Sequence, residues 1–599
     1  MKVIELKPLS KPAKARVEIP GSKSYTNRAL FIAAMAISPV KILKPLISDD
    51  TKAMINCLRT LGVKIVKKRN CLEVFPNLKI TPNSTYNLNA NLSGTTIRFM
   101  LTLSTVIPGI KILRGKEGLN KRPIKELVSG LTQLGAKIEY LKGKGYPPVK
   151  VTSSKLNPGI VKIKGSISSQ YISALLMIAP KVGKVTIEII GNQISKPYIG
   201  ITVDIIKHFG VKVENKKYKN YLIPTNQKYN NKQYLVEGDL SSAAYFLAIA
   251  ALTKSTIALD NVNPNSKQAD MKFVKILEDM GNKIVYGKNK ITIIGKGIKP
   301  ININLTDCPD QVQTLAVLAS FARGTTKISG ISSLKIKETD RVFALRQELD
   351  KMGIKTSATK DTLTIYGGSP KAAKIETYGD HRMAMAFAVA GAKLSGMKII
   401  DPEVVNKTFP AFWEKLKSIG VKTKMVNYEN IVLIGMRGSG KTTVAKLLSQ
   451  KLNKPYVELD QLIVKRVGLT IPEIVEKYGW DFFRDKESEA VQDTSLNNGK
   501  IISTGGGVVT RPQNVDALKK NGLFIFLNAS LETLIKRVGN NSNRPALTNR
   551  KTLSEEIEEI LKQRNQLYRE SADEIIDTNH LNPVEVTDKI ITRLKGVIL

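Results

Sequence analysis

The sequence has few acidic residues, few cysteines and no long apolar run. Aspartate and glutamate together number 51 against 93 lysines and arginines, which gives a formal net charge of +42. The three cysteines, Cys57, Cys71 and Cys308, form neither a disulfide framework nor a spaced metal site. The longest apolar run, residues 243–252, is shorter than the roughly 18 residues that span a bilayer, and residues 1–7 contain no apolar signal core. We therefore expect a cytoplasmic protein without a membrane partner.

The excess of positive charge has two interpretations. One is a nucleic-acid-binding surface, whose lysines and arginines would neutralise phosphates. The basic residues are instead spread along the whole chain, and no zinc-finger, helix-turn-helix or RNA-binding signature is present. We therefore favour a solvated basic surface that attracts small anionic substrates, and we expect no nucleic-acid partner.

A helix that ends in glycine and is followed by a strand recurs six times before residue 424. The six glycines, spaced about 70 residues apart, are Gly62, Gly135, Gly210, Gly281, Gly353 and Gly420. Glycine ends a helix because the residue past the last turn needs a positive φ. Six such α/β modules could form one array or two groups of three. The stretch 234–244 separates the third copy from the fourth, so we predict two three-module lobes with a ligand cleft between them.

Three segments, residues 21–28, 93–98 and 165–170, combine hydroxyls with cations or an amide at a predicted helix start. Free N–H groups at helix starts suit phosphates and carboxylates, although serine and threonine are also ordinary caps. If residues 337–341 are helical, Lys337 and Arg341 point the same way and repel by about 0.2–0.5 kcal/mol. An anionic ligand or a nearby carboxylate would relieve that repulsion. Together these segments indicate an anion-binding site.

These motifs resemble 5-enolpyruvylshikimate-3-phosphate (EPSP) synthase over roughly residues 1–424. The matching segments are GSKSYTNRAL (21–30), SGTTIRF (93–99), RPIKELVSGLTQLGA (122–136), GSISSQ (165–170), SKPY (195–198), VEGDLSSAAYF (236–246), PD (309–310), KETDR (337–341), YGDHRMAM (378–385) and KTFP (407–410). The resemblance implies a two-lobed inside-out α/β barrel of six repeats, with lobe A at 1–18 and 238–424 and lobe B at 19–237. UDP-N-acetylglucosamine enolpyruvyl transferase shares that fold, but its Pro-Cys pair is absent here.

The resemblance also implies roles for individual residues. Phosphoenolpyruvate would be bound by Lys23, Gly94, Arg122, Gln170, Arg341, Arg382 and Lys407. Shikimate 3-phosphate would be bound by Lys23, Ser24, Arg28, Ser168, Ser169, Gln170, Ser195, Tyr198, Asp310 and Lys337. Asp310 would take the proton from the attacking 5-hydroxyl, while Glu338, with Lys23 nearby, would manage the proton at the methylene carbon. Leu92 and Ser333 stand where the family usually has asparagine, which puts ligand affinity in question.

Residues 435–442 read G-x-x-x-x-G-K-T, between an apolar run at 431–434 and a helical pattern at 444–448. That context predicts a phosphate-binding loop, in which Lys441 reaches the β- and γ-phosphates and Thr442 offers a hydroxyl to Mg²⁺. With the segments at 458–460, 483–487, 503–507, 543–545 and 564–568, residues 430–599 resemble shikimate kinase. The resemblance implies a P-loop kinase domain with a parallel sheet.

Two ligand sets follow from the kinase resemblance. ATP would be bound by Gly435, Met436, Arg437, Gly438, Ser439, Gly440, Lys441, Thr442, Thr443 and Arg544. Shikimate would be bound by Asp460, Arg484, Gly505, Gly506, Gly507 and Arg564, because arginine forks suit a carboxylate and Asp460 can orient the attacking hydroxyl. Arg544 lies in a polar segment, 539–549, that fits a mobile lid. Glu458 replaces the usual aspartate, which leaves its link to the Mg²⁺ shell open.

The sequence therefore predicts a bifunctional enzyme, a 3-phosphoshikimate 1-carboxyvinyltransferase fused to a shikimate kinase. The kinase would phosphorylate shikimate with ATP and Mg²⁺, and the synthase would transfer enolpyruvyl from phosphoenolpyruvate to the 5-hydroxyl of that product. The same order of synthase and kinase occurs inside larger aromatic-pathway polypeptides. Two alternatives stay open: a nucleic-acid-stimulated ATPase, and a synthase that carries a degenerate kinase as a scaffold. The intact Lys441, Thr442, Asp460 and Arg484 argue against the scaffold.

Three further expectations concern assembly and inhibition. The sequence leaves the oligomeric state open, and we expect the synthase part to be monomeric. Between Val421 and Ile431 there is almost no linker, which motivates the hypothesis that the intermediate passes directly between the sites. Gly94 is expected to leave room beside the phosphoenolpyruvate pocket, so we predict that the phosphoenolpyruvate-like inhibitor glyphosate binds.

Overall fold

The computed structural model describes residues 2–76, 81, 84–152, 155–539 and 552–595. They fall into two compact units: Glu5–Thr423 is the larger, and the smaller holds the described residues from Lys424 onward together with those up to Ile4. In the described ranges we find no helix whose length and apolar character would let it cross a membrane.

Six four-stranded sheets are found among the described residues up to Asn427. In five of them a parallel pair of strands is extended on one side by an antiparallel hairpin. Three of these sheets use strands between residues 40 and 235. Their orders are β14 (Gln233–Leu235), β3 (Val40–Leu43), β5 (Cys71–Phe75), β4 (Lys64–Lys68); β6 (Thr85–Asn89), β7 (Ile110–Arg114), β9 (Val149–Thr152), β8 (Lys137–Tyr140); and β10 (Gly159–Lys164), β11 (Val185–Ile190), β13 (Asn220–Ile223), β12 (Glu214–Lys216).

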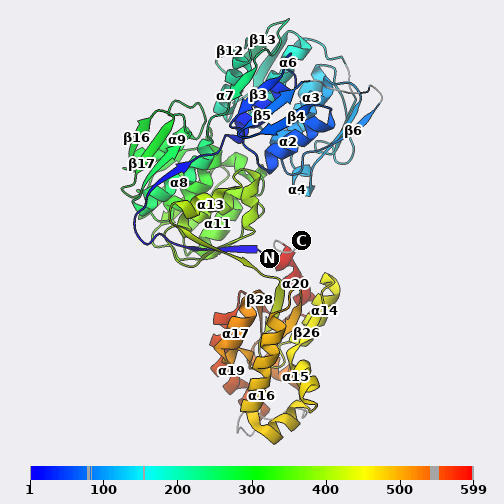
Figure 1. The fold of residues 1–599 in the computed structure, drawn as a ribbon, viewed down its shortest axis with the longest axis vertical. Coiled ribbons are helices and arrows are strands. Elements are labelled where there is room, and N and C mark those ends of the chain that lie inside the picture. The colour runs from blue at the N-terminus through cyan, green and yellow to red at the C-terminus, as the bar shows by residue number, and fades with distance from the viewer. Residues whose placement is uncertain (1, 77–80, 82–83, 153–154, 540–551, 596–599) are drawn as a thin grey trace. The chain divides into compact units, whose positions relative to one another are not determined.

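The other three sheets combine the N-terminal strands with strands that follow residue 255. Their orders are β16 (Lys283–Gly287), β17 (Lys290–Ile294), β15 (Thr256–Asp260), β2 (Lys14–Glu18); β18 (Asn302–Asn304), β19 (Gly324–Ser329), β21 (Thr362–Gly367), β20 (Thr356–Ala358); and β22 (Lys374–Ile375), β23 (Met397–Ile400), β1 (Lys2–Lys7), β24 (Lys422–Asn427). The N-terminal segment thus returns to the later half of the unit, while the strands between residues 40 and 235 make a separate group (Figure 1).

Each repeat glycine follows a helix that packs beside one of these sheets. The helices are α2 (Asp49–Thr60), α5 (Lys125–Gln133), α7 (Lys196–His208), α9 (Met271–Asp279), α11 (Arg341–Lys351) and α13 (Phe412–Ser418). All six glycines have positive φ, from 75° at Gly353 to 104° at Gly420. The prediction that glycine ends each repeat helix is therefore confirmed.

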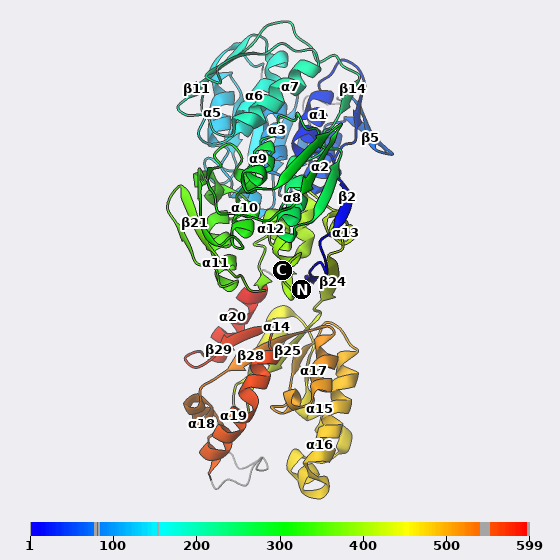
Figure 2. The same cartoon turned by 90° about the vertical axis from the view of Figure 1, so that its left-hand side faces the viewer.

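Six further helices are buried along most of their length. They are α1 (Lys23–Ala33), α3 (Gly94–Thr105), α6 (Ser169–Val182), α8 (Leu240–Thr253), α10 (Val312–Ala319) and α12 (His381–Gly391). Helices that are apolar on every side belong in a protein interior. In Figure 2, α8, α10 and α12 lie between the outer strands β21 and β2. Helices inside and sheets outside make the inside-out α/β architecture that was predicted.

The smaller unit contains one parallel five-stranded sheet. Its order is β26 (Tyr456–Glu458), β27 (Ile501–Ser503), β25 (Asn430–Ile434), β28 (Gly522–Asn528), β29 (Glu574–Asp577). The helices are α14 (Lys441–Leu452), α15 (Leu459–Val467), α16 (Ile471–Ser495), α17 (Pro512–Lys519), α18 (Leu531–Val538), α19 (Leu553–Ser571) and α20 (Pro583–Lys595). β25 is the apolar strand expected before the phosphate-binding loop, and all five of its residues are buried. The predicted parallel sheet is confirmed.

Candidate active sites

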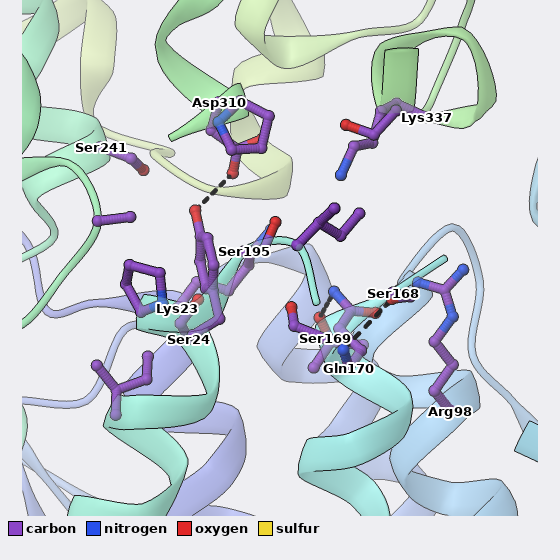
Figure 3. Close-up of a pocket in the computed structure, with 18 of the residues that line it drawn as sticks. Lys23, Ser24, Arg98, Ser168, Ser169, Gln170, Ser195, Ser241, Asp310 and Lys337 are labelled. Atoms are coloured by element: carbon purple, nitrogen blue, oxygen red, sulfur yellow. Dashed lines mark hydrogen bonds between the residues drawn. The ribbon is translucent and has the colours of Figure 1, made fainter. Parts of the chain in front are cut away.

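One cavity of the larger unit gathers most residues predicted for the synthase (Figure 3). The predicted residues that line it are Lys23, Ser24, Arg28, Arg122, Ser168, Ser169, Gln170, Ser195, Tyr198, Asp310, Lys337 and Arg382. In Figure 3, Asp310 and Lys337 enter the cavity from one side, and Lys23, Ser168 and Gln170 enter from the other. These residues come from both halves of the unit, so the cavity lies where the two groups of sheets meet.

The cavity is lined by residues at the start of all six buried helices. Lys23 begins α1, Thr95 lies in the first turn of α3, and Ser169 begins α6. Ser241 and Arg382 lie in the first turns of α8 and α12, and the turn η1 (Pro309–Gln311) leads into α10. Helix N-termini present free N–H groups and a partial positive charge. This convergence favours an anionic ligand before any side-chain charge is counted.

Asp310 is held between cations and a phenol. Its Oδ1 accepts from Arg341 Nη1 at 3.1 Å, and its Oδ2 accepts from Arg382 Nη2 at 2.8 Å. Tyr198 donates its hydroxyl to Oδ2 at 3.2 Å. Burial alone would raise the pKa of Asp310, but the surrounding cations, led by Arg382, hold it well below the usual range. Asp310 is therefore ionised, and it lines the cavity.

Glu338 has a second set of cations. It pairs with Lys407 Nζ at 2.9 Å, Arg341 Nη2 at 2.8 Å and Arg122 Nη1 at 3.5 Å. Burial opposes its ionisation, yet Lys407, Arg341 and Arg122 hold the pKa of Glu338 well below its usual range. Arg341 thus bridges the two carboxylates. Glu338, Arg341 and Lys407 do not line the cavity. Glu338 contacts Arg122 and Arg341 contacts Asp310, both of which line it, and Lys407 pairs with Glu338.

The expectation that Lys337 and Arg341 share one helix face is wrong. Lys337 follows the turn η2 (Ser332–Ile336) with an extended ψ of −144°, and α11 begins only at Arg341. The cause is Asp340, whose side chain accepts from the N–H groups of Val342 and Phe343 and so starts the helix there. The carboxylates of Asp310, Glu338 and Asp380 neutralise the charge of Arg341. A nearby carboxylate was one of the two partners that the sequence allowed for this cation.

Gly94 does not leave open space. A Cβ built on Gly94 would lie 2.7 Å from Arg122 Nη1, so the guanidinium fills the side of the glycine where a side chain would be. The expectation of free room at this point is therefore wrong, and glyphosate binding stays a prediction. Leu92 is 41% exposed and does not line the cavity, whereas Ser333 does.

Two cations are tied to protein partners. Lys23 Nζ lies 3.1 Å from the buried carboxylate of Asp50. Arg28 is fully buried, and its Nε donates to Thr202 Oγ1 at 2.7 Å. Burial lowers the pKa of Arg28 to about 10. Both side chains are thus fixed in direction before a ligand arrives.

Several residues that line the cavity were given no ligand from the sequence, although Thr95 and Arg98 lie in the predicted anion-binding segment 93–98. These unassigned residues are Thr95, Arg98, Tyr171, Asp239, Ser241, Gln268 and Asp270. Arg98 donates to Gln170 Oε1 and lies 5.3 Å from the Tyr171 ring centroid. Arg98 and Ser241 belong to the matching segments named above, so their position next to helix starts could have indicated them. Gln268 and Asp270 belong to no such segment, and no local signal marked them.

In the smaller unit, the predicted phosphate-binding loop connects β25 to α14. Gly435, Gly438 and Gly440 have positive φ, and Lys441 Nζ donates to the carbonyls of Gly435 at 2.8 Å and Met436 at 2.9 Å. Loop residues that line the adjoining cavity are Arg437, Gly438, Gly440, Lys441, Thr442 and Thr443. Gly435 and Ser439 are not among the lining residues. The lysine is held over its own loop, where a phosphate would meet it.

A cation could be held beside Thr442. Its hydroxyl donates to Glu458 Oε1 at 2.5 Å, while Glu458 Oε2 is buried and has no hydrogen-bond partner. Within the part of the chain that the structure describes, no group of three or more histidines, cysteines or carboxylates could hold a metal ion. The hydroxyl of Thr442 and the unpartnered Oε2 of Glu458 fit Mg²⁺, which takes few protein ligands and completes its shell with phosphate and water oxygens.

A second cavity adjoins the loop and contains the predicted shikimate residues. It is lined by Met436, Arg437, Asp460, Arg484, Glu487, Gly505, Gly506, Gly507 and Arg564, with Trp480 and Phe483. Arg437, Asp460 and Gly506 line both cavities, so the two are adjacent. A Cβ on Gly505 would lie 2.7 Å from both Asp460 Oδ1 and Glu487 Oε1. Glycine is required there because carboxylates approach the backbone so closely.

The charges of this second cavity are paired in part. Arg484 Nη1 donates to Glu487 Oε2 at 2.7 Å, and Arg564 Nη1 donates to the Gly506 carbonyl at 3.1 Å. Burial raises the pKa of Glu487, against the opposing effect of Arg484. Glu487 was not predicted as a site residue, although it lies in one of the segments that resemble shikimate kinase. Arg544 and residues 540–549 of the predicted lid lie outside the described residues.

Comparisons with known proteins agree with this geometry. Residues 9–416 match the family model of EPSP synthase (3-phosphoshikimate 1-carboxyvinyltransferase), and residues 437–595 match that of shikimate kinase. The chain is 40% identical over 425 residues to the 3-phosphoshikimate 1-carboxyvinyltransferase of a Sulfurovum species, covering 70% of this chain and 99% of that protein. It is 32% identical over 607 residues to the pentafunctional AROM polypeptide 1 of Lodderomyces elongisporus, covering 93% of this chain and 38% of that protein.

A solved structure, EPSP synthase from Acinetobacter baumannii, has the same fold over 71% of this chain and 100% of its own. Its TM-score is 0.61 at 24% sequence identity, so it bears on the fold alone. The family match covers more than half of the chain, and a shikimate kinase match follows it in the same polypeptide. The chain therefore belongs to the EPSP synthase family and carries a shikimate kinase domain, which makes it a bifunctional enzyme of the shikimate pathway.

Proposed function

We propose that residues 1–424 act as the synthase, with lobes at 1–18 plus 238–424 and at 19–237, and that residues 430–599 act as the kinase. The kinase makes shikimate 3-phosphate from shikimate and ATP, and the synthase condenses this product with phosphoenolpyruvate. Both reactions act on small anions, in keeping with the cation-lined cavities.

In the kinase reaction, Asp460 orients the 3-hydroxyl of shikimate and accepts its proton as the oxygen attacks the γ-phosphorus, while the bond from the γ-phosphorus to the bridging oxygen breaks and ADP leaves. Arg484 and Arg564 bind the carboxylate of shikimate, because a guanidinium fork holds two oxygens at once. Lys441 leaves its two loop carbonyls and donates to the phosphates. Mg²⁺ bound by Thr442 and Glu458 would neutralise charge on the β- and γ-phosphates. Glu458 Oε2, buried without a partner, supports this assignment.

In the synthase reaction, the 5-hydroxyl oxygen attacks C2 of phosphoenolpyruvate and its proton passes to Asp310. Glu338 takes up a proton from water when the two anions bind and delivers it to the methylene carbon, which gives a tetrahedral ketal that still carries phosphate. Glu338 then takes a proton back from the new methyl group as the bond to phosphate breaks, and the proton on Asp310 passes to water. Bound phosphate and carboxylate offset the charge of Lys407, Arg341 and Arg122, so they raise the proton affinity of Glu338 toward what this step requires.

One observation carries the synthase proposal: the carboxylate of Asp310 lines the cavity, the carboxylate of Glu338 is paired with the cavity residue Arg122, and Arg341 links the two. Acid–base chemistry at two ends of one substrate needs such a pair. A nucleic-acid-stimulated ATPase would need neither carboxylate. We take the two kinase cavities, which share Asp460, as support for phosphoryl transfer to a small acid.

A coupled assay tests both activities. The purified chain is given shikimate, ATP, Mg²⁺ and phosphoenolpyruvate, and ADP, shikimate 3-phosphate, phosphate and the enolpyruvyl product are followed separately. We expect shikimate to stimulate ATP consumption and the enolpyruvyl product to appear only when phosphoenolpyruvate is present. Stimulation of ATP hydrolysis by RNA or DNA, with no response to shikimate, would reject the proposal.

A further inference from the structure

Asp270 lines the synthase cavity but has no part in the mechanism above. It occupies the cap position before α9, where an aspartate normally accepts from the first backbone N–H groups of the helix. Here its side chain makes no capping hydrogen bond. Its Oδ1 instead accepts from Gln311 Nε2 at 2.6 Å. The Asp270 carboxylate therefore does not cap α9, and the residue lines the cavity instead.

The partner of Asp270 stands next to the proposed base. Gln311 is fully buried and follows Asp310 in the turn η1. The hydrogen bond from Gln311 thus ties the start of α9 to the turn that presents Asp310. Asp270 is only 4% exposed and lines the same cavity as Asp310. A buried charge in that position acts on Asp310 through a medium that screens poorly.

Asp310 needs an opposing influence if it is to accept a proton. Arg382, Arg341, Lys337 and Lys23 all lower its proton affinity. A general base works best when its pKa lies near the operating pH, so a carboxylate surrounded only by cations is a weak base. A second negative charge beside Asp310 raises its proton affinity again. Asp270 supplies that charge when it is ionised.

The groups that face Asp270 come from several elements. They are Asp310 and Gln311 on η1, Arg382 on α12, Asp239 before α8, Tyr198 on α7 and the thiol of Cys308. Burial and the charge of Asp310 raise the pKa of Asp270 to about 7, against Gln311 and Arg382. Asp270 therefore changes charge within the range in which the enzyme is assayed.

We propose that Asp270 is a positioning residue of the synthase, which holds the Asp310 turn through Gln311 and, when ionised, strengthens Asp310 as a base. The inference rests on the proposed function, because it takes Asp310 as the acceptor of the 5-hydroxyl proton. Synthase turnover should therefore rise with pH as Asp270 loses its proton.

The test compares wild type with Asp270→Asn, which keeps an oxygen for Gln311 Nε2 but carries no charge. Synthase kcat and KM are measured with shikimate 3-phosphate and phosphoenolpyruvate from pH 5.5 to 8.5 in buffers of constant ionic strength. We expect kcat of the wild type to rise through about pH 7. In Asp270→Asn we expect kcat to be roughly tenfold lower at pH 8 and to lack this rise, with both KM values changed less than about threefold.

Asp279→Asn serves as the matched control, because Asp279 ends the same helix and is half exposed. It should keep the wild-type rate and pH profile. If Asp270→Asn unfolds, Asp270→Glu is measured instead. This variant keeps the charge on a longer side chain, so the midpoint of the rise in kcat with pH should shift. If the role of Asp270 were merely structural, the midpoint would stay in place. A rise near pH 7 that survives in Asp270→Asn, or an unchanged kcat, overturns the proposal. A wild type that makes no enolpyruvyl product overturns the proposed function itself.

Discussion

The two active sites hold their cations in different ways. In the synthase cavity, Arg341, Lys407 and Lys23 are paired with carboxylates of the protein. In the kinase loop, Lys441 donates to two neutral backbone carbonyls. An anion that enters the synthase must share its cations with carboxylates that remain in place. A nucleotide that enters the kinase meets a lysine that donates to the carbonyls of Gly435 and Met436.

This difference follows from the chemistry that each site has to perform. Enolpyruvyl transfer moves protons at two positions, so the synthase keeps ionised bases among its cations. Phosphoryl transfer depends mainly on positioning and on neutralising phosphate charge, so the kinase loop presents donors that are easily released. This contrast concerns the phosphate-binding loop, because Arg484 in the second kinase cavity is paired with the carboxylate of Glu487, as the synthase cations are with theirs.

Replacing the synthase base should have the largest effect. Asp310→Asn should lower synthase kcat about 10²–10⁴-fold, the usual contribution of a general base, and leave kinase turnover unchanged. Shikimate 3-phosphate should accumulate in the coupled assay. Asp307→Asn, three residues earlier, is the control and should behave as wild type. Equal loss of both activities in Asp310→Asn would contradict the assignment.

Replacing the loop lysine tests the other side of the comparison. Lys441→Ala should lower kinase kcat by about 10²–10³-fold, because a preorganised donor to the transferred phosphate is lost. Synthase turnover of supplied shikimate 3-phosphate should not change. Lys446→Ala, on the exposed face of the same helix, provides the control. If the synthase failed as well, the two sites would not be independent.

The two regions should also differ in how pH affects stability. Glu338 has a lowered pKa, so its ion pairs stabilise the fold above the unfolded pKa of roughly 4.3 and are lost only as pH falls through the lower folded value. Glu338→Gln should cost about 2 kcal/mol at pH 7 and the same at pH 5. Glu487 has a raised pKa, so wild type should lose stability relative to Glu487→Gln as pH rises above about 4.

Denaturant unfolding can check this difference in pH dependence. Each unit contains one tryptophan, Trp413 in the synthase and Trp480 in the kinase. Single-tryptophan variants would therefore report the two units separately. Equal pH slopes for the Glu338→Gln and Glu487→Gln differences between pH 5 and pH 7 would refute this contrast.

A smaller effect is expected at Gly94. A methyl group at this position would displace the Arg122 guanidinium, whose Nη1 stands 2.7 Å from the point that a Cβ would occupy. Gly94→Ala should raise KM for phosphoenolpyruvate about tenfold with little change in KM for shikimate 3-phosphate. Gly118→Ala is the control, because its methyl group would meet only Leu92 at an ordinary 3.6 Å. An unchanged KM in Gly94→Ala would mean that Arg122 does not bind this substrate.

The smallest effect is expected at the family departure Leu92. Leu92→Asn restores the usual residue, but Leu92 does not line the cavity. We expect KM for phosphoenolpyruvate to change less than about threefold. A tenfold improvement would show that position 92 reaches the substrate after all.

Local signals in the sequence predicted the repeat but not its assembly. Each repeat glycine marks a helix end through its own backbone preference, so the six modules could be counted. The return of β2 to pair with β15 leaves no local signal, because that pairing joins residues more than 240 positions apart. Only the family resemblance implied it, through a lobe made of residues 1–18 and 238–424. The helix assumed at 337–341 failed because the cap at Asp340 outweighs the spacing of the two cations.

Site residues were predictable where a motif placed them at a helix start. Lys23, Ser169 and Arg382 lie beside such starts, and the sequence marked each of them. Asp270 also precedes a helix, but its role depends on Gln311 and Asp310, which are brought to it only by the fold. Pairings such as Lys407 with Glu338 likewise depend on tertiary structure.

The convergence of six helix starts on the synthase cavity has a consequence for its robustness. Each start contributes roughly half a unit of positive charge from its peptide groups. Peptide groups neither gain nor lose a proton in water, and no side-chain replacement deletes them. The electrostatic attraction for a phosphorylated acid should therefore persist when the pH changes or when individual lysines are replaced. The surrounding residues are then free to diverge while the reaction is kept.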